Sequence, residues 1–427
     1  MATVVVGGGF SGCAAAAAAA RAGTEVILLE KTDMLAGLGL LTGVLTGEGG
    51  SIAVEEAKAM GAGDIWEAIE SVVTHKIDFI EKLGKRGTQV FSVIRLEGAL
   101  RDALGSLGVK VRLSSRVKDV AMKADSITHV VLDDNTRLEG ESFVDATGSI
   151  GTVAECSKYG FGCVMCIMRC PTFGGRVSIS AKAGVRDFMC RRKDGTPGAL
   201  SSAFMLEKNS LAAQIVSELD RNGYIIVPLP PEFIRMDKLE KITATANAKP
   251  VFIENLVVFN NGFAKVSVQS FMPLDELHCV PGFENARMAD PISGGVGNAV
   301  RFLAMAPRDN SMKVEGVANL YCAGEKSGPV SGIHPAITTG ILAGHNAARY
   351  ALGKEGIQLP RSTAIGDFIA FIKEKAASEE GLKSRCNYRG VFLERIKKIG
   401  LFNADGQEVR DRVKKEGLTG IFAQKLT

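Results

Sequence analysis

The first 31 residues constrain the fold of this chain more than any other stretch. They begin with a β-branched apolar run, Thr3 to Val6, which is followed by a glycine turn and an alanine-rich segment, Cys13 to Ala22. A second apolar run, Val26 to Leu29, closes the unit. This change from strand to helix and back to strand predicts a βαβ unit with parallel strands. We therefore expect an α/β protein.

The glycine turn between the first strand and the helix has the spacing of a dinucleotide-binding turn. Gly7, Gly9 and Gly12 satisfy G-x-G-x-x-G, and Glu30 follows the second strand. Glycines in these places allow a tight turn, close approach of a pyrophosphate, and close packing of helix on strand. A carboxylate at Glu30 can hold ribose hydroxyls, while the helix N-terminus faces the phosphates. We expect these residues, with Lys31, to bind the ADP half of a dinucleotide.

Composition places the chain among ordinary globular proteins. It has 427 residues, 46% of them apolar and 23% charged, which is enough for a core and two or three domains. The net charge is +4, and no basic run carries interleaved aromatic residues, so nucleic acid is not indicated as a partner. No apolar run reaches the roughly 20 residues of a membrane span, and no cleavable signal peptide is recognised. We expect a cytoplasmic protein without a membrane partner.

Later segments indicate which dinucleotide is bound. The stretch 32–50, "TDMLAGLGLLTGVLTGEGG", looks like the second glycine cluster of flavin enzymes and contains Gly37 and Gly39. The predicted strand Phe143 to Asp145 ends in Ala146, Thr147 and Gly148, which resembles the A-T-G element of FAD-dependent oxidoreductases. FAD is therefore the expected cofactor.

A third segment supports the same cofactor. The strand Leu320 to Ala323 continues into Gly324 and Glu325, and a helix follows from about Pro335 to Tyr350. The N-terminal dipole of such a helix stabilises negative charge on a reduced flavin.

On these motifs the chain resembles the FAD-dependent oxidoreductase superfamily with the glutathione-reductase-type FAD fold. From residue 279 ("CVPGFENARMADP") to 350 it is more similar to the glucose-inhibited division protein A family and its folate-dependent tRNA-uridine methyltransferase relatives. Those enzymes use FAD to reduce a folate-derived carbon on uridine. The resemblance implies that Val117 contacts the adenine, that Glu325 binds the ribityl chain, and that the helix around Ala336 points at the flavin.

The same resemblance divides the chain into four parts. We expect a Rossmann-like FAD-binding domain, an inserted α+β substrate domain and a helical C-terminal tail. The expected boundaries are 1–157 and 286–360 for the two parts of the FAD-binding domain, 158–285 for the substrate domain and 361–427 for the tail. The tail helix is expected to begin with Ser362 as its N-cap.

A cysteine-rich stretch, "GFGCVMCIMRCPTFGGR" at 160–176, opens the substrate domain. Three interpretations stay open: redox or nucleophilic thiols facing the flavin, ligands of an iron–sulfur cluster, or a buried strand. In the first, the catalytic residues are Cys163, Cys166 and Cys170, assisted by Arg169. In the second, Cys156 or Cys190 completes the ligand set.

These observations favour an FAD-dependent oxidoreductase, a reductase that exchanges hydride between flavin N5 and a small-molecule substrate. His334 is a candidate proton donor or acceptor. No second dinucleotide turn is found, so NAD(P)H is expected only as a transient donor. One alternative is an FAD- and folate-dependent enzyme that modifies RNA uridine, and another is a flavin and iron–sulfur electron-transfer subunit. The expected protein partner is a second copy of the chain or an electron-transfer protein.

Overall fold

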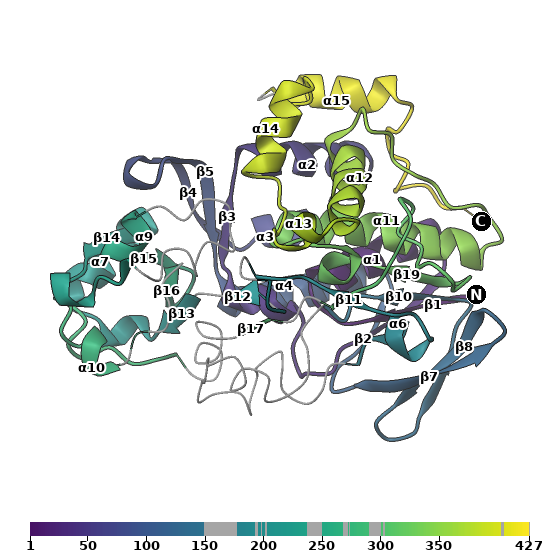
Figure 1. Ribbon diagram of the computed structural model, residues 1–427, viewed down its shortest axis with the longest axis horizontal. Coiled ribbons are helices and arrows are strands. Elements are labelled where there is room, and N and C mark those ends of the chain that lie inside the picture. The colour runs from purple at the N-terminus through teal and green to yellow at the C-terminus, as the bar shows by residue number, and fades with distance from the viewer. Residues whose placement is uncertain are drawn as a thin grey trace.

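The computed structural model describes residues 1–148, 177–192, 195–197, 199–200, 203–236, 250–267, 272, 274–289, 300–301, 304–402 and 405–426. Its centre is a five-stranded parallel sheet in the order β19-β10-β1-β2-β6 (Figure 1). The strands are β1 (Ala2–Val6), β2 (Glu25–Leu29), β6 (Lys110–Arg112), β10 (Ser142–Asp145) and β19 (Leu320–Cys322). The predicted βαβ unit is thus present, with β1 in the middle of the sheet.

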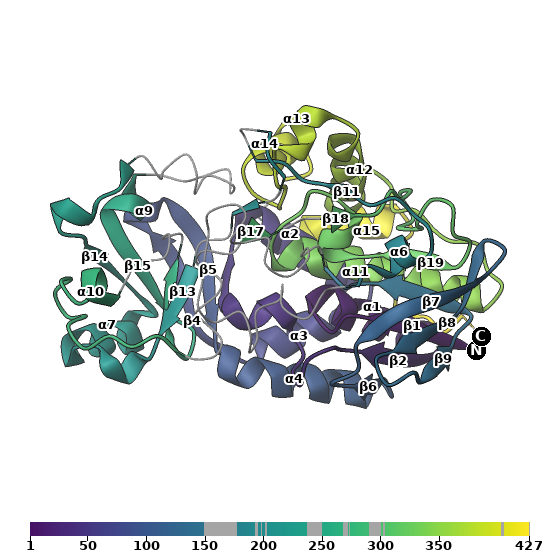
Figure 2. The same cartoon turned by 60° about the horizontal axis from the view of Figure 1, so that its bottom comes forward.

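Helices cover one face of this sheet. They are α1 (Phe10–Ala22), α3 (Asp64–Glu70), α4 (Val93–Ser106) and α11 (Ile333–Ala351). Helices α1 and α11 cross closely because α1 is rich in alanine and α11 carries Gly344, where an added Cβ would lie 2.0 Å from the carbonyl oxygen of Ala15. Segments more than 300 residues apart therefore form one helical layer (Figure 2).

An antiparallel meander covers the other face of the parallel sheet. It consists of β7 (Val117–Lys123), β8 (Ser126–Leu132) and β9 (Arg137–Glu139). Val117, Ile127 and Val130 share a core with Val4 and Phe143 of the sheet. The meander therefore places Val117, at the start of β7, next to the parallel sheet.

A four-stranded antiparallel sheet lies at the opposite end of the molecule from the meander (Figures 1 and 2). It has the strand order β13-β16-β15-β14 and is covered by α7 (Ala213–Asn222). Its strands are β13 (Ala203–Leu206), β14 (Tyr224–Pro228), β15 (Asn255–Asn260) and β16 (Ala264–Ser267). A third sheet, formed by β3 (Val44–Thr46), β4 (Val73–Ile80) and β5 (Lys85–Phe91), packs against β15.

The C-terminal region is helical and lies at the top of Figure 1, next to α2 (Glu48–Ala59). Its helices are α12 (Ala364–Ala376), α13 (Glu379–Leu382), α14 (Val391–Lys398) and α15 (Gly406–Lys415). The prediction of Ser362 as the N-cap is wrong. Helix α12 begins one residue later, because the Thr363 hydroxyl accepts the Gly366 N–H at 3.0 Å.

The fold agrees with the expected class, an α/β protein with a Rossmann-like FAD-binding part. The domain boundaries stay a prediction. Among the described residues, no helix is long and apolar enough to cross a membrane.

Candidate cofactor site

A cleft of about 370 Å³ opens at the carboxyl end of the parallel sheet. This is the edge at which open α/β sheets bind their ligands. Its walls come from the turn after β1, the segment after β2, the turn after β10, the loop after β19 and the first turn of α11. All of the sequence-predicted cofactor residues except Gly12 line it: Gly7, Gly9, Glu30, Lys31, Gly37, Gly39, Val117, Ala146, Thr147, Gly148, Gly324, Glu325 and Ala336.

The turn before α1 leaves room for a diphosphate. Gly7 has φ of +107°, a conformation that residues with a Cβ rarely adopt. An added Cβ at Gly9 would meet no atom closer than 4.0 Å, so this position opens into the cleft. The first intrahelical bond runs from Cys13 N–H to Gly9 C=O at 2.9 Å, which leaves the earlier N–H groups of α1 without an intrahelical acceptor. Helix N-termini of this kind bind phosphate.

Gly12 lies behind the cleft wall and has a packing role. An added Cβ there would lie 1.7 Å from the carbonyl oxygen of Gly7. The third glycine of the motif thus allows helix α1 to pack directly on the end of β1, as the motif predicts.

Glu30 holds the end of β2 in a fixed position. Its Oε2 accepts the Gly8 N–H at 2.7 Å, and its Oε1 accepts the Thr32 N–H at 2.8 Å and the Thr32 hydroxyl at 3.0 Å. A carboxylate has about four lone-pair sites, so these three bonds leave one acceptor position. That position suits a ribose hydroxyl.

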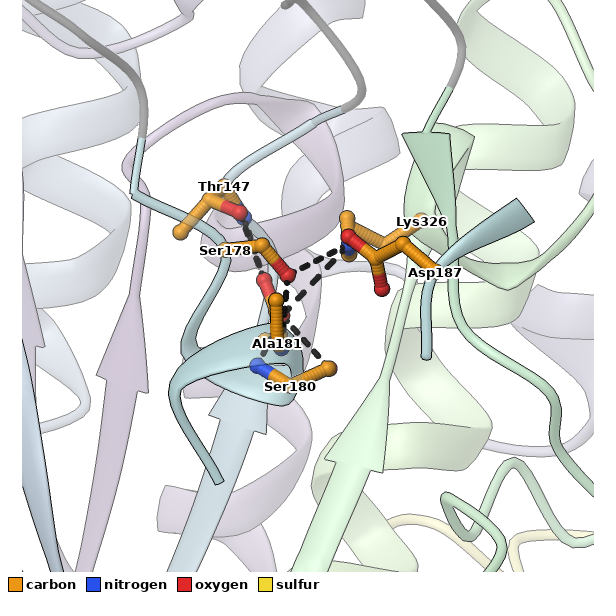
Figure 3. A network of polar contacts seen from close by, with 7 residues as sticks. Thr147, Ser178, Ser180, Ala181, Asp187 and Lys326 are labelled. Carbon is orange, nitrogen blue, oxygen red and sulfur yellow. Dashed lines mark hydrogen bonds and ion pairs between the residues drawn. The ribbon is translucent and has the colours of Figure 1, made fainter. Parts of the chain in front are cut away.

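The A-T-G turn is supported from behind by a buried carboxylate. Oδ1 of Asp145, at the end of β10, accepts the Thr147 hydroxyl at 2.6 Å. Its Oδ2 accepts the Ser180 hydroxyl at 2.7 Å and the Ser180 N–H at 3.0 Å (Figure 3). One side chain therefore connects the cleft wall to the segment that begins at residue 177.

Lys326, one residue after Glu325, completes this network. Its side chain is 1% exposed, and its Nζ lies 2.8 Å from Asp187 Oδ2, 2.8 Å from Ser178 Oγ and 3.9 Å from Asp145 Oδ2. Figure 3 shows Ser178 and Asp187 close to the Lys326 ammonium. The loop after β19 is thereby held against the A-T-G turn.

Three further parts of the protein line the cleft: a 3-10 turn, Gly37–Leu41, Gly332 and Ile333 at the start of α11, and Lys265 of β16. We expect the flavin ring to lie beside them. Lys265 is the only cleft-lining residue among those described that comes from the four-stranded sheet.

The His334 side chain lies outside the cleft. Its imidazole packs against Trp66 at 5.3 Å and Tyr388 at 6.4 Å between ring centroids, and it does not line the cleft. Burial, together with the charge of Arg389, lowers its pKa to about 3. Its catalytic role stays a prediction that this orientation does not favour.

Of the cysteines considered as catalytic residues or cluster ligands, only one lies in the described part of the chain. Cys156, Cys163, Cys166, Cys170 and the neighbouring Arg169 lie outside the described residues. Cys190 is described: it is buried, its Sγ lies 3.9 Å from Met305 Sδ, and burial raises its pKa to about 12. In the described part of the chain, no group of three or more His, Cys, Asp or Glu side chains could hold a metal ion.

Together, the sheet edge, the glycine turn, the buried acid and the two helix N-termini define a dinucleotide-binding flavoprotein fold. Residues 3–161 match the family model described as FAD dependent oxidoreductase, and residues 232–355 match glucose inhibited division protein A. The chain thus contains a part like the FAD-dependent oxidoreductases and a part like glucose inhibited division protein A.

Curated relatives share about a quarter of the chain. The tRNA uridine 5-carboxymethylaminomethyl modification enzyme MnmG of Pediococcus pentosaceus is 40% identical over 121 residues, 27% of this chain and 18% of its own length. The Bacillus subtilis enzyme of the same name is 38% identical over 118 residues, 26% of this chain and 18% of its own length. The alignment thus spans about a fifth of these relatives.

Solved structures support the fold. Two crystal forms of Aquifex aeolicus GidA superpose with TM-scores of 0.62 and 0.61 at 17% and 18% identity. They cover 97% of this chain, and 76% and 78% of the respective GidA chains.

These relatives correct one expectation and leave others without support. The expectation of a small-molecule substrate, with nucleic acid not indicated, is wrong, because the relatives' name states that they modify a tRNA uridine. FAD is supported by both matched families. The matched families and the structures named above give no support for NAD(P)H or for an iron–sulfur cluster.

Sequence reasoning missed the two lysines of the site. The Lys326 ammonium binds Asp187, which lies 139 residues earlier in the sequence. Lys265 occurs in an apolar strand, on the face opposite to Ala264 and Val266. Period-two alternation could have marked Lys265 as facing away from the core of its own sheet. Nothing local could have shown that a cleft covers it.

Proposed function

We propose that this protein is an FAD-dependent enzyme that modifies a uridine in tRNA with a folate-derived carbon. One observation carries the proposal. The segment that matches glucose inhibited division protein A contributes Lys265, Gly324, Glu325 and the start of α11 to the cleft wall. This supports a reaction of the kind that such proteins catalyse at the bound cofactor.

The described residues fit FAD along the whole cleft. The first turn of α1 and the open position at Gly9 would receive the diphosphate, and Glu30 would accept a ribose hydroxyl. Glu325 and the A-T-G turn would hold the ribityl chain. Bound FAD supplies hydride chemistry, which the protein directs by orienting the ring and excluding water.

The N-terminus of α11 has a defined electrostatic effect on this chemistry. Gly332 and Ile333, at its start, line the cleft, so the helix dipole presents partial positive charge there. A site of this kind lowers the free energy of an anionic ring relative to a neutral one. It therefore favours reduction of the cofactor.

The test is an assay of nucleosides. Purified protein with FAD, a one-carbon tetrahydrofolate and dithionite is incubated with an unmodified tRNA transcript, which is then digested and analysed by mass spectrometry. We expect a uridine-derived nucleoside of higher mass, whose formation requires both FAD and the folate. Flavin-loaded protein that leaves every uridine unchanged would refute the uridine substrate while leaving the FAD assignment intact.

A further inference from the structure

Lys265 is a buried cation in the cofactor cleft. It lies on β16, and its cross-strand neighbours are Met205 on β13 and Phe259 on β15. Both neighbours are 1% exposed, and Lys265 itself is 8% exposed. The lysine is therefore flanked by apolar side chains while it lines the cleft.

The described part of the protein provides no counter-charge for Lys265. No ion pair or hydrogen bond joins its ammonium to a described residue, and the charges that act on it are the cations Lys85 and Arg389. Burial is the larger cause, and these two cations add to it, lowering the pKa of Lys265 to about 7. A buried charge without a partner is costly, so its presence in a cleft indicates a ligand that compensates it.

We propose that Lys265 contacts the ring of bound FAD and that its ammonium compensates the negative charge of the reduced ring. This inference rests on the assignment of the cleft to FAD. Two electrons from a reductant such as dithionite, with one proton from water, leave the ring with one negative charge. An adjacent ammonium stabilises that charge more than it stabilises the neutral oxidised ring.

The proposal gives Lys265 opposite effects on the apoprotein and on the cofactor-bound protein. In the apoprotein Lys265→Met removes a buried amine whose charged form the surroundings disfavour, and it fills the space with a side chain of similar length, so thermal stability should stay equal or rise. In the FAD-bound protein the same change removes the favourable contact. A lysine that only supports the fold would lose stability in both states.

Sulfite binding to the oxidised flavin provides the direct measurement. The sulfur lone pair forms a bond to ring N5, and the electron pair enters the ring as negative charge, with loss of flavin absorbance. We expect the dissociation constant of sulfite to rise at least about tenfold in Lys265→Met and to stay within about threefold of wild type in Lys265→Arg. Lys85→Met, which removes a neighbouring cation that is not part of the cleft, should change it less than about twofold.

Three outcomes would overturn the proposal. Lys265→Met could bind FAD and sulfite as the wild type does, or its apoprotein could be the less stable one. If the wild-type protein does not bind FAD, both this inference and the proposed function fail, whereas normal FAD binding with unchanged sulfite affinity refutes Lys265 alone. If the wild type forms no adduct with sulfite, reduction of the flavin in equilibrium with a redox dye compares the same two proteins. At equal dye potential, Lys265→Met should then contain a higher proportion of oxidised flavin than the wild type.

Discussion

At the scale of single residues, the three glycines of the first turn have different tasks. Gly7 supplies a backbone conformation, Gly9 leaves space for a ligand, and Gly12 leaves space for another part of the protein. The spacing alone predicted that these positions are glycine for such reasons. The structure separates the binding role of Gly9 from the packing role of Gly12.

Substitutions at Gly9 and Gly12 should therefore differ: one should weaken FAD binding and the other should weaken folding. Gly9→Val places methyl groups in the cleft, so we expect at least a tenfold loss of FAD affinity with little change in apoprotein stability. Gly12→Ala forces a carbonyl oxygen away and should destabilise the apoprotein by about 3 kcal/mol. Flavin titration and urea unfolding of both variants measure this. Equal apoprotein stabilities would contradict it.

A buried histidine on α11 makes stability depend on pH. His345 is fully buried, neither ring nitrogen has a hydrogen-bond partner in the described part of the protein, and its ring lies 5.0 Å from that of Phe422. Burial, with Arg349 nearby, lowers its pKa from 6.5 to about 4. The unfolded chain therefore binds a proton that the folded protein does not between these values, and stability falls as pH drops through this window.

Replacing this histidine should remove its part of the pH dependence. Between pH 7.5 and 5 the wild type should lose roughly 2 kcal/mol more unfolding free energy than His345→Leu. Urea unfolding at both pH values gives the difference. Identical pH dependences in the two proteins would show that His345 is not the group responsible.

At the scale of secondary-structure elements, Glu56 on α2 joins three helices. Its carboxylate accepts the Ala364 and Ile365 N–H groups of α12 at 2.8 and 2.9 Å, and it also binds Arg412 of α15 at 2.9 Å. The sequence indicated that α12 exists and where it begins within one residue. It could not indicate that a carboxylate 308 positions earlier caps the helix, since no local pattern connects the two.

The neighbouring acid provides a matched control for this junction. Glu56→Ala leaves Arg412 and two N–H groups without their acceptor in a buried place, so we expect a loss of about 3–5 kcal/mol. Glu55→Ala removes only the half-exposed pair with Arg410 and should cost at most about 1 kcal/mol. Denaturant unfolding measures both. Similar losses would mean that the junction does not depend on Glu56.

At the scale of the whole molecule, the sequence predicted the parallel sheet and most of the cleft, because each cofactor element is a short motif next to a strand. It did not predict Lys265 or Lys326, because both obtain their surroundings from distant segments. The expected substrate was wrong for a related reason. Composition reports the average charge of the chain, and a net charge of +4 does not reveal what a single cleft binds.

The cleft needs segments more than 300 residues apart in the sequence, and this has a consequence for biosynthesis. Helix α1 packs against α11, and the C-terminal Leu426 N–H bonds to the Ala22 carbonyl at the end of α1. When a ribosome has synthesised residue 300, the alanine-rich surface of α1 is complete, but the helix that covers it does not yet exist. The nascent protein must therefore wait through most of translation, with this surface unprotected, before its cofactor can be loaded.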